Sequence, residues 1–249
     1  MDKTLLKGLS VLEAIAEMQD ELRVIEDLAA RVGLSRSNTH RTLQTLIHAG
    51  YVERRVGEGG YRPTLKMFEF GLRQLNRLDV RRLAPPFMLT LARGTGETIH
   101  LSVLDGLDVV YVDKIDSEQA VRAYSVVGGR APAHAVATGK ALLAVSCPAR
   151  LDRLPASLPR FTPTTITDPS ALREALDEAR RIGFAINRGE WREDVGGLAA
   201  PIFDGLKRPV AALGISGPLT RLTPARLEEL AAQVVDAAAR LSSALGHAA

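Results

Sequence analysis

The 249-residue sequence predicts two domains of different class, joined by a linker helix. Residues 24–62 have the pattern helix, tight turn, helix and glycine-tipped hairpin, which is typical of a winged helix-turn-helix. Residues 98–245 interleave strand and helix patterns, which predicts an α+β domain large enough to hold a small ligand. We therefore expect an all-α/winged helix-turn-helix DNA-binding domain at 1–66, a linker helix at 67–84 and an α+β domain at 85–249.

Three helices are expected before the hairpin. The first is marked by apolar residues at helical spacing, namely Leu6, Leu9, Leu12, Ile15 and Ala16. The second covers 24–32 and ends at Gly33, which can adopt the positive φ of a tight turn. Ser35 is a good N-cap for the third, because its hydroxyl accepts from free backbone N–H groups. Gly50 ends that helix as a C′ residue.

The third helix has the composition of a DNA-reading helix. Its apolar stripe is narrow, and residues 35–50 contain no Asp or Glu. Its other face carries side chains that bind phosphates and base edges, namely Arg36, Ser37, Asn38, His40, Arg41, Gln44 and Thr45. A polar helix face is commonly only solvated, so the wing and the charge distribution are needed to favour DNA.

The predicted wing follows this helix without a gap. Two short extended runs at 51–56 and 61–63 flank the tip Gly57-Glu58-Gly59-Gly60. The arms carry Arg54, Arg55 and Arg62, which suit the phosphate backbone beside the groove. Residues 31–66 hold seven Lys or Arg against two Asp or Glu, whereas the whole chain has a net charge of only +3. The positive charge thus gathers where a DNA footprint is expected.

Composition and the pattern of apolar residues narrow the possible classes of protein. The single cysteine, Cys147, excludes an intramolecular disulfide and a cysteine zinc site, and we expect its thiol to be buried and inert. The amino terminus lacks a signal-peptide pattern, and no uncharged apolar run approaches the ~20 residues that span a bilayer. We expect a cytoplasmic protein without membrane contact.

The linker helix is predicted from one apolar seam. Its members recur three or four residues apart, and they are Leu65, Phe68, Leu72, Leu75 and Leu78. Such a seam packs against a second chain or against its own domain, and the sequence favours neither arrangement.

The α+β domain is expected from nine further segments. A hairpin around Asp105-Gly106 joins strands at 98–103 and 109–112, and 121–126 is another candidate strand. Helices are expected at 138–145, at 169–182 with Asp168 as N-cap, and at 223–245 with Thr223 as N-cap. Three more strands are expected near 184–187, 198–203 and 210–216.

Several residues of this domain suit an acidic ligand. Gly128 and Gly129 can expose backbone N–H groups as an anion nest, and Arg130 can donate two hydrogen bonds to a carboxylate. A Gly-Gly-Arg segment is more often only a turn, and a lone histidine such as His134 is more often structural. Trp191, the only tryptophan, lies in a polar loop and could cover a ligand or pack against a partner chain, although generic packing is at least as common.

An enzyme acting on a small organic acid is the alternative class. The sequence contains no GxSxG, HExxH or P-loop motif, and no GxGxxG after a strand. Only five histidines are present, and His40 and His48 belong to the predicted reading helix. We expect no catalytic residue, no metal and no cofactor.

Four segments, in order, resemble the isocitrate lyase regulator (IclR) family of bacterial transcription factors. They are KGLSVLEAIA with LAARVGLSRSNTHRTLQTLIHAGYVER, then GGRAPAHAVATGKALLA, GLAAPIFD and GISGP. The resemblance covers nearly the whole chain. It implies a repressor or activator that binds an operator in double-stranded DNA, forms a homodimer or homotetramer, and responds to a small organic acid of a catabolic pathway.

The resemblance also implies a GAF/profilin-like effector domain and a set of effector-binding residues. By motif position these are Gly128, Gly129, Arg130, His134, Ala137, Glu190, Trp191, Asp194, Gly197 and Ser216. Some family members carry Cys or Ser at the position of Gly197 and Ser at that of Gly214. Glycine at both positions is expected to leave room for an effector that is larger or less polar than a two-carbon acid, such as an aromatic or branched acid.

Overall fold

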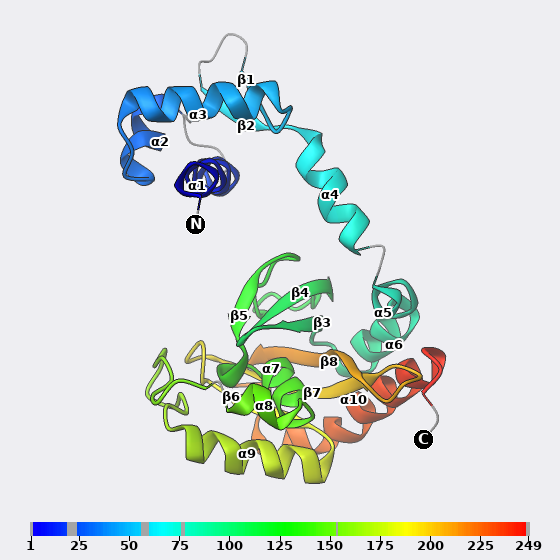
Figure 1. Cartoon of the computed structure of the whole chain (residues 1–249). Coiled ribbons are helices and arrows are strands. Elements are labelled where there is room, and N and C mark those ends of the chain that lie inside the picture. Colours follow the sequence, from blue (N-terminus) through cyan, green and yellow to red (C-terminus); the bar gives the residue numbers. More distant parts are fainter. Residues whose placement is uncertain (1, 19–23, 56–59, 76–77, 153, 248–249) are drawn as a thin grey trace. The chain divides into compact units, whose positions relative to one another are not determined.

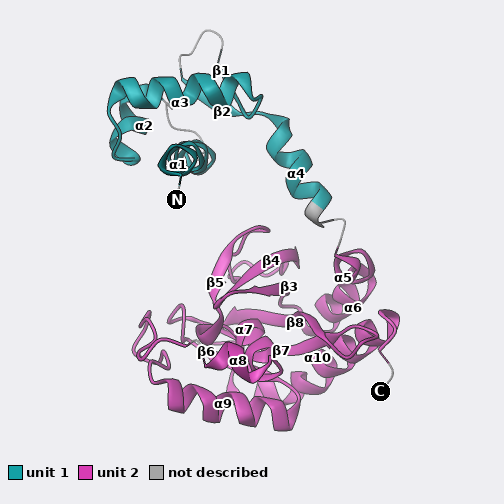
Figure 2. Ribbon diagram, in the orientation of Figure 1, with its two compact units in different colours: residues 1–77 teal, residues 78–249 magenta. Residues whose placement is uncertain are grey.

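The computed structural model describes residues 2–18, 24–55, 60–75, 78–152 and 154–247. The chain forms two compact units, residues 1–77 and residues 78–249 (Figure 2). None of the helices described is long and apolar enough to cross a membrane.

Unit 1 is the predicted winged helix-turn-helix. Its elements are α1 (Lys3–Glu17), α2 (Ile25–Arg31), α3 (Arg36–His48), β1 (Val52–Arg54) and β2 (Tyr61–Pro63), with β1 and β2 antiparallel (Figure 1). The predicted N-cap is confirmed, because Ser35 Oγ accepts from Asn38 N at 3.3 Å. Gly33 and Gly50 have φ values of 65° and 76°, so both turns use the left-handed conformation that glycine permits.

The inward face of α1 differs from the prediction. Val11, Ala14 and Ile15 are buried against the core, whereas Leu6 and Leu9 are 43% and 46% exposed. Residues 11, 14, 15 and 18 also recur at helical spacing, so α1 is apolar on two sides. Periodicity alone could not indicate which side faces α2 and α3.

Two helices lie where the sequence predicted one linker helix. The first, α4 (Leu65–Leu75), belongs to unit 1, and the second, α5 (Asp79–Leu83), belongs to unit 2. Leu78 is extended, with φ −89° and ψ 91°, so α5 begins anew at Asp79. The reason is packing, because Val80 is buried in unit 2 and Arg81 Nε donates to Val112 O at 3.0 Å.

Unit 2 is built on a six-stranded antiparallel sheet in the order β5-β4-β3-β8-β7-β6 (Figure 1). The strands are β3 (Thr98–Asp105), β4 (Asp108–Ile115), β5 (Arg130–Pro132), β6 (Ala185–Arg188), β7 (Val195–Phe203) and β8 (Pro209–Pro218). In this register Ser216 pairs with Gly197 on one side and with Thr98 on the other, while His100 pairs with Gly214. Strands far apart in the sequence therefore meet at the centre of the sheet.

Helices pack on both faces of this sheet. One face carries α7 (Ala137–Ala144), which packs on β7 and β8 and against α9 (Pro169–Ile182), with the short α8 (Pro148–Leu151) nearby. The other carries α10 (Pro224–Ala244), which packs against α6 (Pro85–Thr95). The predicted caps are confirmed, since Asp168 accepts from Ser170 N and Thr223 accepts from Arg226 N.

Two expectations for unit 2 are wrong. Residues 121–126 form no strand, and two of their carbonyl groups accept from side chains rather than from a neighbouring strand. Arg221 Nη1 donates to Val121 O at 2.8 Å, and Lys114 Nζ donates to Ser125 O at 2.6 Å. Cys147 is exposed rather than buried, because it lies at the surface turn that precedes α8.

Candidate functional site

The exposed face of α3 keeps the polar side chains that the sequence placed there. Arg36, Ser37, His40, Gln44 and Thr45 are exposed, as is Arg41, and Asn38 is half-buried. Arg41 Nη2 donates to Asn38 Oδ1 at 3.0 Å, which holds both side chains on one surface. The helix thus presents donors and acceptors outward, while Leu43 anchors it in the core.

The wing arginines differ in how they are held. Arg62 Nε lies 2.6 Å from Glu53 Oε1, so a carboxylate already partners that guanidinium. Arg54 lies over the Tyr61 ring, with 5.8 Å from Cζ to the ring centroid. Arg54, Tyr61 and the amino-terminal part of α3 line one open hollow of about 600 Å³. The wing and the reading helix therefore share a surface, as a groove-binding unit requires.

Unit 2 contains a cavity of about 300 Å³ on the α7 side of its sheet. The sheet supplies His100, Tyr111, Gly197 and Ser216, and the start of α7 with the residue before it supplies Val136, Ala137 and Thr138. The β6–β7 hairpin supplies Asn187, Trp191, Arg192 and Val195. The loop before β5 supplies Arg122, Ala123, Tyr124 and Ser125.

The buried end of the cavity is polar and uncharged. His100 Nε2 lies 2.6 Å from Ser216 Oγ, and its Nδ1 lies 3.4 Å from Ser125 Oγ. Burial lowers the pKa of His100 to about 4, with a smaller contribution from the Lys114 ammonium. Burial also raises the pKa of Tyr111 to about 12. Both rings are therefore neutral near pH 7, and they offer hydrogen bonds rather than charge.

The exposed rim of the cavity is cationic. Arg122 and Arg192 are both exposed, and the lining contains no Asp or Glu. Arg192 Cζ lies 4.8 Å from the centroid of the Trp191 ring, which orients its guanidinium. Within the described part of the chain, neither arginine forms an ion pair. The cavity therefore combines an apolar body, a neutral polar end and a positive entrance.

Four of the ten predicted effector residues line this cavity: Ala137, Trp191, Gly197 and Ser216. Six do not: Gly128, Gly129, Arg130, His134, Glu190 and Asp194. Each of these six has a different partner.

Arg130 and the two glycines make no anion site in this structure. Arg130 is exposed and pairs with Asp105 at 2.9 Å and with Asp108 at 3.3 Å. Gly128 N donates to Tyr111 O at 2.7 Å, and Gly129 N donates to Val126 O at 3.0 Å. Because these amides are used within the chain, the expected anion nest is absent from these residues.

The remaining three predicted residues, His134, Glu190 and Asp194, also have their partners outside the cavity. His134 is buried, with Nε2 3.0 Å from Pro159 O, so it is a structural histidine. Glu190 is buried in an ion pair with Lys140. Asp194 is exposed, and its carbonyl accepts from Leu219 N at 2.8 Å.

The expectation that glycine at 197 and 214 widens the cavity is also wrong. A Cβ at Gly197 would lie 2.6 Å from Ile215 O, and one at Gly214 would lie 2.8 Å from Leu198 O. Both glycines therefore permit close backbone approach within the sheet, and a side chain there would meet backbone rather than open space.

His100, Tyr111, Arg122 and Asn187 are cavity residues that sequence reasoning missed. His100 had one usable signal, because it is the ionisable side chain on the polar side of the alternating run Thr98 to Val103. Arg122 was hidden by the assignment of 121–126 to a strand.

Two family models match this chain in order along its length. The IclR helix-turn-helix domain matches residues 4–56, and the bacterial transcriptional regulator IclR C-terminal domain matches residues 72–243. The chain belongs to the IclR family. It is accordingly a transcriptional regulator with a DNA-binding helix-turn-helix domain and an effector-binding carboxy-terminal domain, and not an enzyme.

Curated IclR-family relatives cover almost the full chain. It is similar to the regulator XynR of Escherichia coli (36% identical, 97% of this chain and 96% of the relative). It is also similar to the regulator KdgR of Escherichia coli (37% identical, 98% of this chain and 93% of the relative). The transcriptional repressor IclR of the same organism is 34% identical over 98% of this chain and 90% of its own length.

Solved IclR-family structures have the same fold. The Thermotoga maritima IclR crystal structure matches with a TM-score of 0.79 and 30% identity, covering 98% of this chain and 99% of the other. An IclR homologue from Microbacterium hydrocarbonoxydans, complexed with 4-hydroxybenzoate, matches with a TM-score of 0.83 and 28% identity, again over 98% and 99%.

Proposed function

We propose that this regulator responds to a small aromatic or branched organic acid that binds in the unit 2 cavity. The observation that carries the proposal is the lining, which has two arginines and no carboxylate at an otherwise largely apolar site. A volume of about 300 Å³ is at the small end of the range for ligand sites. An acid with one compact apolar body suits that volume and charge.

The expected ligand pose follows from the polarity of the two ends. The carboxylate lies at the rim, where Arg122 and Arg192 donate charge-assisted hydrogen bonds. The far end of the ligand meets the neutral pair His100 and Ser216, which suits a hydroxyl group. The homologue that was crystallised with 4-hydroxybenzoate binds a ligand of this chemistry, which supports the assignment.

The DNA contacts we propose come from α3 and the wing. Base edges and phosphates are bound by the exposed face of α3, which comprises Arg36, Ser37, Asn38, His40, Arg41, Gln44 and Thr45. Arg54, Arg55 and Arg62 contact the phosphate backbone beside the groove. The cytoplasm, where such DNA lies, is the proposed location.

We propose a homodimer, or a homotetramer of two such dimers, as the DNA-binding form. On one face of α4 the side chains of Leu65, Phe68 and Leu72 are 78%, 64% and 37% exposed, which is unusual for large apolar residues on one short helix. A second copy that covers this face would place two reading helices on two half-sites of a pseudo-palindromic operator.

Selection of DNA by the full chain tests this function. Duplexes with a randomised centre are selected for binding, and the binding of the enriched sequence is then measured with and without each acid of a panel. We expect one preferred sequence and at least one aromatic or branched acid that changes its Kd. Enrichment of no sequence would contradict the operator-reading role, and an enriched duplex unaffected by every acid would contradict the effector class.

A further inference from the structure

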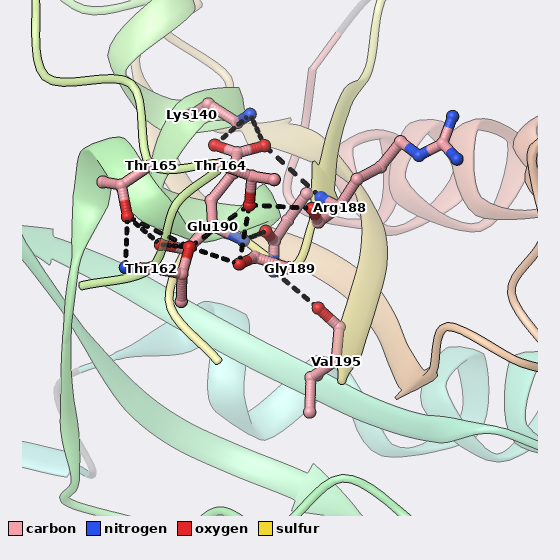
Figure 3. Close-up of polar contacts among 9 residues, drawn as sticks. Lys140, Thr162, Thr164, Thr165, Arg188, Gly189, Glu190 and Val195 are labelled. Carbon is pink, nitrogen blue, oxygen red and sulfur yellow. Dashed lines mark hydrogen bonds and ion pairs between the residues drawn. The ribbon is translucent and has the colours of Figure 1, made fainter. Parts of the chain in front are cut away.

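A buried ion pair joins α7 to the β6–β7 loop beside the cavity. Lys140 Nζ lies 2.6 Å from Glu190 Oε1 and 2.7 Å from its Oε2, and the side chains are only 7% and 9% exposed (Figure 3). Burial lowers the pKa of Lys140, although Glu190 opposes that shift. Removing either partner would leave the other charge buried and uncompensated, so each charge needs the other where these two elements meet.

Glu190 is also tied into its own loop. Its Oε1 accepts from Arg188 N at 3.3 Å, and its backbone N donates to Asn187 Oδ1 at 2.9 Å. The Asn187 side chain is therefore oriented by Glu190, and Asn187 is itself part of the cavity wall.

Threonine hydroxyls hold the opposite side of this loop (Figure 3). Thr162 Oγ1 donates to Gly189 O at 2.6 Å, and Thr165 Oγ1 donates to Glu190 O at 2.6 Å. Thr164 Oγ1 also donates to Gly189 O, at 2.9 Å. The loop is thus clamped between the threonine segment and Lys140, and its backbone has one defined position.

The ion pair touches both walls of the cavity without lining it. On α7, Ala137 and Thr138 line the cavity less than one turn before Lys140. On the β6–β7 hairpin, Asn187 of β6 and Trp191 of the loop line it on either side of Glu190. The distance between these two walls is therefore set where Lys140 meets Glu190.

We propose that Lys140 and Glu190 are positioning residues for the effector: their ion pair holds the wall formed by Asn187 and Trp191 against α7 and so preorganises the ligand site. This inference rests on the proposed binding of an acid in that cavity. A buried ion pair is often no more stabilising than an apolar pair of similar volume. Its advantage here is a fixed geometry, which reduces the ordering that ligand binding would otherwise require.

Trp191 gives a readout that needs no ligand, because it is the only tryptophan and follows Glu190 directly. The test uses the full chain, its Glu190→Gln variant and the double variant Lys140→Met with Glu190→Met, which leaves no unpaired charge. We expect the variants to show red-shifted tryptophan emission and about a twofold rise in the acrylamide quenching constant, because the loop opens locally.

Leu230→Ala is the matched control. Leu230 is fully buried on α10, on the other face of the sheet, so this change destabilises unit 2 without touching α7 or the loop. It should lower the melting temperature and leave Trp191 quenching unchanged. Equal quenching in the parent and in a folded double variant would overturn the proposal, as would the same rise in Leu230→Ala.

A ligand titration forms the second arm, with 4-hydroxybenzoate as the probe. If it binds the parent, we expect its Kd to rise about tenfold in the double variant. An unchanged Kd would overturn the positioning role. If the probe binds neither protein, the proposed effector class loses that support, while the quenching comparison still decides whether the ion pair holds the loop.

Discussion

Ser216 Oγ and His100 Nε2 lie 2.6 Å apart in the cavity wall, on neighbouring strands whose residues are 116 positions apart in the sequence. Because burial keeps His100 neutral near pH 7, its ring donates through one nitrogen and accepts through the other. Ser216 can therefore either donate to a ligand or accept from it, depending on the tautomer of the ring. This suits a neutral hydroxyl better than a second carboxylate.

Burial of His100 predicts a pH dependence of stability. Its pKa is about 4 in the folded protein, against 6.5 for an unperturbed histidine, so only the unfolded chain binds a proton between these values. The contribution of His100 to the free energy of unfolding should be fully present above pH 6.5, and the free energy of unfolding should fall by about 3 kcal/mol as the pH drops to 4. Urea unfolding of the parent and of His100→Gln across this range measures it. Equal slopes for the two proteins would contradict the assignment.

Arg41→Ala and Gln44→Ala should weaken operator binding without unfolding unit 1. Both side chains are exposed on α3, and a specific base contact contributes about 1–3 kcal/mol. Arg31→Ala is the control, because Arg31 lies on α2 and pairs with Glu17 at 2.8 Å. Binding to the selected duplex is measured at one salt concentration. Parent-like affinity in both α3 variants would mean that this helix does not read the operator.

Wing arginines should act mainly through phosphates. Removing Arg54 or Arg55 should weaken binding to all duplexes alike and reduce the slope of log K against log salt by about one for each phosphate that is no longer bound. Arg62→Ala should have the smaller effect, since Glu53 partly neutralises Arg62. A weakening confined to one base position would indicate that the wing reads sequence instead.

The exposed face of α4 should mediate self-association. Phe68→Asp with Leu72→Asp places two carboxylates in the proposed interface, where they would be buried without partners, and should shift sedimentation towards a monomer. Leu75 is the next member of the predicted seam, but the structure does not describe its side chain, so it is not part of this test. Arg73→Asp, an exposed change on the same helix, is the control. An unchanged oligomer in the double variant would exclude α4 as the interface.

Local signals made the elements predictable. Ser35, Asp168 and Thr223 each cap a helix through contacts within three residues, so short sequence windows contain the information. The reading helix and its wing were predictable for the same reason. The faces of α1 were not, because its apolar residues satisfy helical spacing on two sides.

The pairing of strands that are distant in the sequence determines which residues line the cavity, and the sequence does not reveal that pairing. Arg130 pairs with Asp105 and Asp108 because β5 lies beside β4, with Arg130 opposite Val110. No local pattern shows that these carboxylates take the arginine away from the cavity. His100 joins Ser216 through the pairing of β3 with β8, which is equally invisible in either segment alone.

Calorimetric titration of the full chain with aromatic and branched acids tests the effector site most directly. The parent is compared with Arg122→Ala, Ser216→Ala and Arg130→Ala. An acid that binds the parent should bind about tenfold more weakly to the first two, because each loses a hydrogen bond to the ligand. Arg130→Ala should bind it as the parent does, since Arg130 is paired outside the cavity. An acid that alters operator binding, yet binds Arg122→Ala and Ser216→Ala with parental affinity, would contradict this site.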